Sequence, residues 1–340
     1  MRKKLPALIG LAILAVLPQV LGDEWNWLIF LTNRALVFAI MAVGLNLLTG
    51  FAGQISIGHA AFMAVGAFAS YGLTHFYGIP FWGAMPVAGL VAGLVGYGLG
   101  FPALRLSGHY LAIATLGFGV AVPQLLNIWE SLTGGWTGVK PSAPYLFGLS
   151  FREDRPYFYL LLVVLWLLAG MAFNIVKTRT GRSFIALRDS EVAAQAMGIS
   201  LTKYKTMAFA VSAFYAGIGG SLYAHMINYV SPHDFGLGIS MELFTIICLG
   251  GLASVNGAII GAVFMSLLPK LVEKVSVALQ RSGAFDNSPF LSNMFKNLNQ
   301  VLTGVILILV VLYLPRGLVD LWRHAREWYG RRAEAAKEVR

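Results

Sequence analysis

Apolar runs of about 20 residues recur along most of this 340-residue chain, and this recurrence restricts its fold more than any other feature. A helix needs roughly 20 apolar residues to cross the ~30 Å hydrocarbon core of a bilayer. Charged residues form 12% of the chain, whereas an ordinary soluble domain carries about a quarter. The alternating segments of about ten residues that mark a transmembrane barrel are not seen. We therefore expect an all-α fold, a polytopic helical membrane protein with about ten transmembrane or partly spanning helices in a single domain, residues 1–340.

The expected spans follow the apolar runs, at 5–22, 27–49, 54–77, 82–104, 107–130, 157–176, 205–228, 240–253, 255–275 and 297–315. The run 240–253 is too short for a comfortable full crossing. The run 5–22 could instead be a cleaved signal peptide, because a basic start precedes it and small residues follow it. A retained helix is favoured, since the run is long for a signal peptide and Pro18 lies near its end.

Basic residues indicate the direction of the spans, because cytoplasmic loops accumulate Lys and Arg. With alternating spans and an N-terminus inside, seventeen Lys and Arg fall inside and seven outside. Both termini are therefore expected in the cytoplasm, with 320–340 as a cytoplasmic tail. Its residues 325–340 are basic and amphipathic, which favours contact with anionic lipid headgroups. The net charge of +10 thus follows membrane topology, and no nucleic-acid partner is expected.

Several kinds of active site lack their sequence signatures. The chain has no phosphate loop of the G-x-x-x-x-G-K-[ST] type and no H-E-x-x-H or paired-cysteine metal motif. Its one cysteine is Cys248. Few ionisable residues fall within spans, whereas a proton-coupled carrier usually contains a relay of such groups. We expect no catalytic residues, no cofactor and no metal, and an energy source outside the chain.

The longest predicted cytoplasmic loop, 179–204, contains a short helix with the sequence EVAAQAM. Asp189 or Ser190 suits its N-cap, Gly198 suits the position after its end, and Glu191 lies in the first turn. Four apolar residues fall on one face at four-residue spacing: Val192, Ala193, Ala196 and Met197. The loop could be a solvated connector, but small residues on one face favour docking into a groove of a partner.

Five stretches resemble the permeases of branched-chain amino-acid ABC importers. They are ALRDSEVAAQAMGIS, LTGFAGQISIGHAAFMAVGA, LTGGWTGV at 132–139, the block 231–262 and LPRGL at 314–318. The first stretch is similar to the coupling-helix loop of that class. Together the five stretches cover roughly residues 30–320, and they point to the LivM type of permease subunit. Ala253 and Ala258 stand where the family commonly has Gly and Pro, which puts only the local backbone shape in doubt.

The resemblance implies a non-catalytic permease subunit in the bacterial inner membrane. Its partners would be a second permease subunit of the LivH type, two ABC ATPase subunits and an external solute-binding protein. The solute would be a branched-chain amino acid or a related small solute. The residues implied for ATPase coupling are Arg188, Asp189, Glu191, Ala193, Ala194, Met197 and Gly198. A self-sufficient secondary transporter is the alternative, and an intramembrane enzyme would need a convergent nucleophile or metal set that the sequence does not show.

Glycines and polar residues interrupt two apolar stretches, 48–68 and 250–266, which align loosely as a weak internal repeat. Irregular backbone at membrane depth is tolerated only beside protein or water, so a transport path is one explanation. The candidate path residues are Gln54, Ser56, Gly58, His59, Thr115, Glu242, Asn256 and Gly257.

Each type of candidate path residue also has a structural explanation. Close helix packing is favoured for the glycines. A helix cap is favoured for Glu242 over contact with a substrate amine. A bond to its own helix carbonyl is slightly favoured for Thr115, and a bond to a neighbouring carbonyl would also account for His59.

Overall fold

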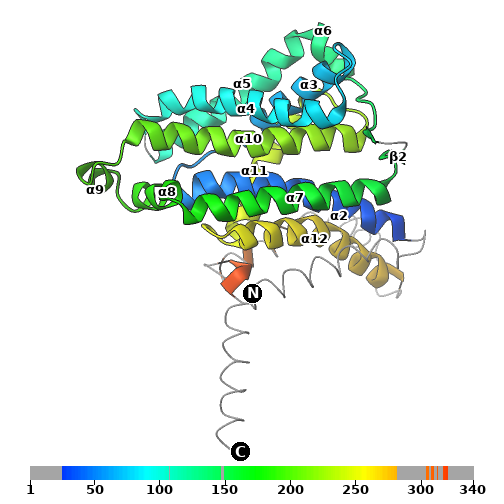
Figure 1. Ribbon diagram of the computed structural model, residues 1–340. Helices are drawn as coiled ribbons and strands as arrows, with labels where there is room; N and C mark the ends of the chain where they lie inside the picture. The colour runs from blue at the N-terminus through cyan, green and yellow to red at the C-terminus, as the bar shows by residue number, and fades with distance from the viewer. Residues whose placement is uncertain are drawn as a thin grey trace, which may run out of the picture.

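The computed structural model describes residues 25–106, 108–146 and 149–281, together with 304–305, 308–309, 312 and 317–320. In this part of the chain the fold is a bundle of long helices with short connections at its two ends (Figure 1). The all-α fold class is confirmed. The expected spans 5–22 and 297–315 fall almost wholly outside the described residues, as does the tail beyond residue 320.

The helices and strands follow one another in the order α2 (Asn26–Asn46), the π-helix η2 (Leu47–Phe51), α3 (His59–His75), α4 (Phe81–Ala103), α5 (His109–Ile128), α6 (Glu130–Thr133), the 3₁₀-helix η3 (Gly135–Thr137), β1 (Tyr145–Leu146), β2 (Leu149–Ser150), α7 (Asp154–Lys177), α8 (Arg179–Asp189), α9 (Glu191–Ala196), α10 (Leu201–Ile227), the 3₁₀-helix η4 (Pro232–Phe235), α11 (Leu237–Gly250) and α12 (Val255–Arg281).

Seven helices in the described ranges are long and apolar enough to cross a membrane, so the expected count of about ten is not confirmed. Two expected spans differ in detail from the helices found. The run 54–77 becomes helical only at His59, and α3 has 17 residues. The run 240–253 is part of a longer candidate span, because α11 begins earlier, at Leu237, and with η4 before the extended Gly236 it makes Pro232–Gly250 a candidate of 19 residues.

Helix α10 lies in the middle of the bundle and packs against α3, α4 and α2 (Figure 1). Small residues make this close packing possible, as they commonly do between membrane helices. A Cβ atom at Gly66 of α3 would meet the backbone of Gly217, and one at Gly220 would meet the backbone of Met63. The packing interpretation therefore accounts for these glycines.

The two ends of the bundle are different. Helices α8 and α9 form a corner at one end, and the β1–β2 hairpin lies at the opposite end (Figure 1). The hairpin is antiparallel, with Tyr145 opposite Ser150. Near it, Val139 and Val230 exchange backbone hydrogen bonds of 2.8 and 3.0 Å. The positive-inside argument assigns the α8–α9 end to the cytoplasm, and this assignment stays a prediction.

A buried chain of hydrogen bonds fixes α3 and α10 to the loop before the hairpin. The hydroxyl of Ser221 donates to Ser70 Oγ at 2.7 Å, and Ser70 lies 3.1 Å from His225 Nε2. His225 Nδ1 lies 2.6 Å from the carbonyl oxygen of Ser142, so Nδ1 carries the proton and Nε2 accepts. The three side chains are at most 1% exposed. Although Ser and His also occur in nucleophilic sites, this cluster is closed to substrate and serves packing.

Candidate functional site

The short helix α9 forms as its capping residues predict. Ser190 is the N-cap, and its Oγ accepts a hydrogen bond of 3.2 Å from the backbone N–H of Ala193. Gly198 follows the helix at φ +80°, a conformation that favours glycine. Asp189, the alternative N-cap, instead pairs with Arg188 at 2.9 Å.

The apolar face of α9 projects away from the bundle. Val192 is 81% exposed and Met197 is 83% exposed, and Ala193 and Ala196 are exposed with them. Ala194 is the exception among the expected coupling residues, because it is 3% exposed and faces inward. An apolar face of this kind on a capped helix is suited to insertion into a groove.

The inner side of α9 carries an ion pair. The Glu191 carboxylate lies 2.7 Å from the Lys205 ammonium at the start of α10. The Lys205 side chain is 2% exposed, and that of Glu191 is 33% exposed. Gln54 Nε2 donates to the same Glu191 oxygen at 3.4 Å. The structure therefore brings Gln54, expected in the transport path, to the corner formed by α8 and α9.

The chain between α2 and α3 is irregular, as its glycines indicate. Helix α2 ends in the π-helix η2, and residues 52–58 are not helical. Gly53 has φ +70°, and a Cβ there would lie 2.9–3.1 Å from Arg188 atoms. Arg188 Nη1 also donates to the Gly50 carbonyl oxygen at 3.4 Å. We call residues 52–58 the connecting segment. This segment packs directly against the corner formed by α8 and α9.

A second irregular link, residues 251–254 between α11 and α12, meets the end of α2. The buried Asn46 side chain donates to the carbonyl oxygens of Gly251 and Ser254 at 3.2 and 2.8 Å. Its Oδ1 accepts from the N–H of Ala253 at 2.9 Å. The stretch 250–266 is thus interrupted only at 251–254, because α12 is continuous from Val255. The two interrupted stretches of the sequence are neighbours in space.

The far part of the connecting segment rests on α5. The Ile57 N–H donates to Thr115 Oγ1 at 3.1 Å, and a Cβ at Gly58 would overlap the Thr115 carbonyl. A Cβ at Gly119 would lie 2.6 Å from the Gly58 Cα. Thr115 also donates to the carbonyl of Ala112 in its own helix at 3.0 Å. Thr115 and Gly58 thus make the structural contacts expected of them, and Thr115 additionally holds the segment. Their place in a transport path stays a prediction.

Ser56 and His59 are completely buried in this region. His59 Nε2 lies 3.4 Å from Ser212 Oγ, not from a carbonyl as expected. Ser56 Oγ and His59 Nδ1 have no hydrogen-bond partner among the described residues. Two unpartnered buried polar atoms are unusual, and water or a moving neighbour can explain them.

Glu242 is not a helix cap. Helix α11 begins at Leu237, after Gly236, so Glu242 lies in its second turn. Its carboxylate accepts two hydrogen bonds from Arg34 of α2, at 2.7 and 2.9 Å. The Arg34 guanidinium also lies 4.8 Å from the centre of the Phe38 ring. The pair joins two spans and satisfies both charges.

Asn256 and Gly257 lie in the first turn of α12. The Asn256 side chain is exposed, whereas Gly257 is buried, and a Cβ on it would lie within 3.0 Å of the backbone of Gly250 and Gly251. Gly257 therefore serves the contact between α11 and α12.

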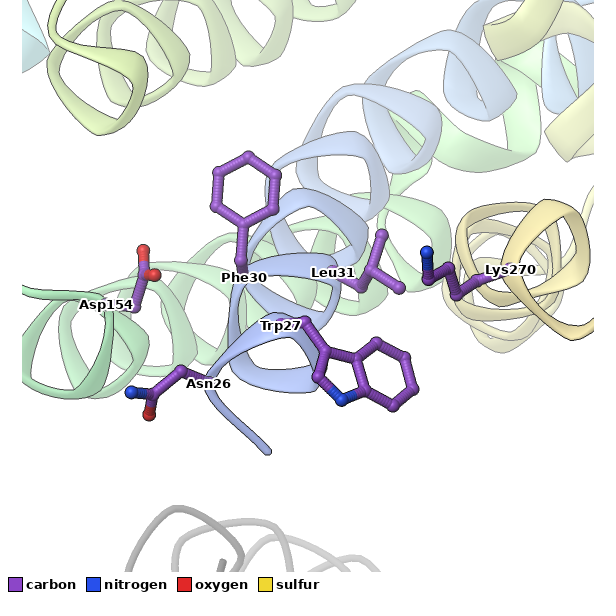
Figure 2. Close-up of a pocket in the computed structure, with 6 residues that line it drawn as sticks. All are labelled: Asn26, Trp27, Phe30, Leu31, Asp154 and Lys270. Atoms are coloured by element: carbon purple, nitrogen blue, oxygen red, sulfur yellow. The ribbon is translucent and has the colours of Figure 1, made fainter. Parts of the chain in front are cut away.

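A cavity of about 370 Å³ lies at the end of the bundle away from α9. The residues that line it come from α2, α7 and α12 (Figure 2): Asn26, Trp27, Phe30, Leu31, Asp154 and Lys270. It contains none of the candidate path residues. In the part of the chain that the structure describes, no three His, Cys, Asp or Glu side chains are grouped to hold a metal ion.

Sequence reasoning predicted the short helix α9 and the irregular connecting segment but not the residues that join them. Lys205 looked like one more cytoplasmic charge, and Asn46 like a residue within a span. A signal was present in Arg34 and Glu242, because two opposite charges within spans suggest a pair.

Comparison with known proteins identifies similar chains. Residues 27–311 match the family described as the permease component of branched-chain amino acid transport systems. The high-affinity branched-chain amino acid transport system permease protein LivM of Salmonella typhimurium is 33% identical, over 94% of this chain and 78% of its own length. LivM of Escherichia coli K12 is 32% identical, over 89% and 74%. The autoinducer 2 import system permease protein LsrC of Escherichia coli O9:H4 is 25% identical, over 95% and 90%. No solved structure matches the chain.

Proposed function

The chain belongs to the family of permease components of branched-chain amino acid transport systems, and we propose that it is the membrane-spanning subunit of an ABC importer. Its solute is a branched-chain amino acid. It works with a second permease subunit of the LivH type, two ATPase subunits and an external solute-binding protein. Substrate identity rests on the names of the LivM relatives. The similarity to LsrC keeps other small solutes as outcomes of the test.

One observation carries the coupling part of this proposal. The capped helix α9 presents Val192 and Met197, more than 80% exposed, at the end of the bundle opposite the hairpin. An apolar face that projects from a loop requires a partner to cover it, since water solvates apolar surface poorly. An ATPase groove is the partner that the family membership suggests.

The transport assay uses the chain assembled with the ATPases, second permease and solute-binding protein of the same importer, in vesicles with ATP inside. We expect uptake of labelled leucine, isoleucine and valine that depends on ATP. Val192→Asp and Met197→Asp are expected to release the ATPases, because a carboxylate in an apolar groove must be desolvated. Leu149→Asp is the matched control, because Leu149 is 67% exposed but lies at the other end.

Two results would refute this function. The first is ATP-independent uptake by the purified chain alone in response to an ion gradient, which a secondary transporter would give. The second is retention of the ATPases by both α9 variants. A cysteine at position 192 should also cross-link to an ATPase, whereas one at 149 should not.

A further inference from the structure

We propose that Lys205 and Gln54 connect the coupling helix to the interior of the permease, with Glu191 as their common partner. The Lys205–Glu191–Gln54 linkage passes movement of α9 into the connecting segment and from there into α5. Glu191 acts within the chain, and the ATPase is held by Val192 and Met197. This inference rests on the proposed function, because movement of α9 must be driven by an ATPase.

The first part of the linkage is the ion pair across the corner. The Lys205 side chain is 2% exposed, and its ammonium lies 2.7 Å from Glu191. A buried ammonium needs a paired carboxylate, because the charge has lost its water. Glu191 is therefore held toward the bundle, and α9 cannot move away from α10 without exposing Lys205 or leaving it unpaired.

The second part is Gln54 in the connecting segment. Its amide nitrogen is shared between Glu191 at 3.4 Å and the Ala52 carbonyl at 3.3 Å. Its Oε1 is buried and has no partner among the described residues. A rotated amide would place this oxygen against the carboxylate, so the observed orientation is the favourable one. The unpartnered oxygen marks a contact that a rearranged corner could improve.

The third part carries the movement onward. Three residues beyond Gln54, the Ile57 N–H bonds to Thr115 of α5 at 3.1 Å. The Ala60 N–H bonds to Ser240 of α11 at 3.0 Å. Gly58 and Gly119 are in backbone contact, which leaves no free space between the segment and α5. Displacement of residues 54–58 must therefore displace α5.

Helix α5 can respond because, within the described part of the chain, only one of its sides is packed. Its buried residues form a single stripe, Leu111, Thr115, Gly119 and Pro123. Ile113 and Leu125 on its other side are 65% and 64% exposed. A helix with one contact face can tilt with that face without breaking other packing.

The test uses the assembled transporter and three measurements, which are ATPase retention, ATP hydrolysis and solute uptake. Lys205→Met and Gln54→Ala are expected to retain the ATPases and hydrolyse ATP while uptake falls about tenfold, within the range of coupling changes caused by single residues. Lys203→Met is the matched control, because Lys203 lies two residues earlier on the same helix and is exposed. The charge swap Glu191→Lys with Lys205→Glu should recover part of the loss.

The outcomes separate the two proposals. Parental uptake by both Lys205→Met and Gln54→Ala would overturn the linkage while leaving the importer intact. Loss of ATPase retention in Lys205→Met and Gln54→Ala alike would assign these residues to docking instead. An unmodified chain that never binds an ATPase would overturn the proposed function itself.

Discussion

Replacement of Gly119 by alanine tests whether the connecting segment packs against α5 with no space between them. The new Cβ would lie 2.6 Å from the Gly58 Cα, and ordinary contact begins at 3.4 Å, so the two elements must separate by about 0.8 Å. The 3.1 Å hydrogen bond between Ile57 and Thr115 would then be stretched beyond its useful range.

Two costs determine the expected loss of stability. Overpacking in a well-packed interior costs about 1–3 kcal/mol, and a lost hydrogen bond costs about 1 kcal/mol. Together they reduce the free energy of unfolding by about 2–4 kcal/mol. At about 2 °C per kcal/mol for a chain of this size, Tm should fall by about 4–8 °C.

The assay is thermal unfolding of the purified subunit in detergent, beside a matched variant. Gly117→Ala changes the same helix two residues earlier, where a Cβ has no described atom within 4 Å. Alanine favours helix over glycine by about 1 kcal/mol, so Tm should stay level or rise slightly. Equal Tm values for the two variants would refute the close contact between the connecting segment and α5. They would also refute the inference that α5 moves with the segment.

Three further variants test other contacts, all by Tm in detergent. Glu242→Gln should cost about 1–2 kcal/mol, because it removes the negative charge that lies 2.7 Å from the half-buried Arg34 guanidinium; an unchanged Tm would show that the charge of the pair contributes nothing. Gly261→Leu should prevent α11 and α12 from closing, since its Cβ would already meet backbone atoms of α11, whereas Gly238→Leu has open space and should be tolerated. Tyr157→Phe removes a 2.6 Å hydrogen bond to the Leu222 carbonyl oxygen of α10 and should cost about 1 kcal/mol; an unchanged Tm would show that this bond contributes nothing.

The parts of the fold set by local chemistry could be predicted from the sequence. Length and apolarity located the helices, and the capping chemistry of Ser190 and Gly198 located α9. The exact start of α3 was not predictable, because the residues 54–58 are compatible with a helix and their tertiary partners decide otherwise. Thr115 and Arg188 hold that stretch out of the helix from α5 and α8.

The candidate site could be predicted only in part, because tertiary contacts decide it as well. Glycines in membrane chains indicate close approach or a path, and sequence alone does not say what approaches. Gln54 and Glu191 are 137 positions apart, and Arg34 and Glu242 are 208 apart. Pairs so far apart along the sequence are brought together by the packing of whole helices. No local sequence pattern near either residue therefore indicates its partner.

Asn46 has a consequence for how relatives of this chain can vary. Its two amide protons and its oxygen all bond to backbone atoms of residues 251–254. Aspartate would oppose two carbonyl oxygens with a third acceptor, and glutamine would be one methylene too long. A homologue with another residue at this position must therefore have a reshaped α11–α12 link, so the two places should change together across the lineage.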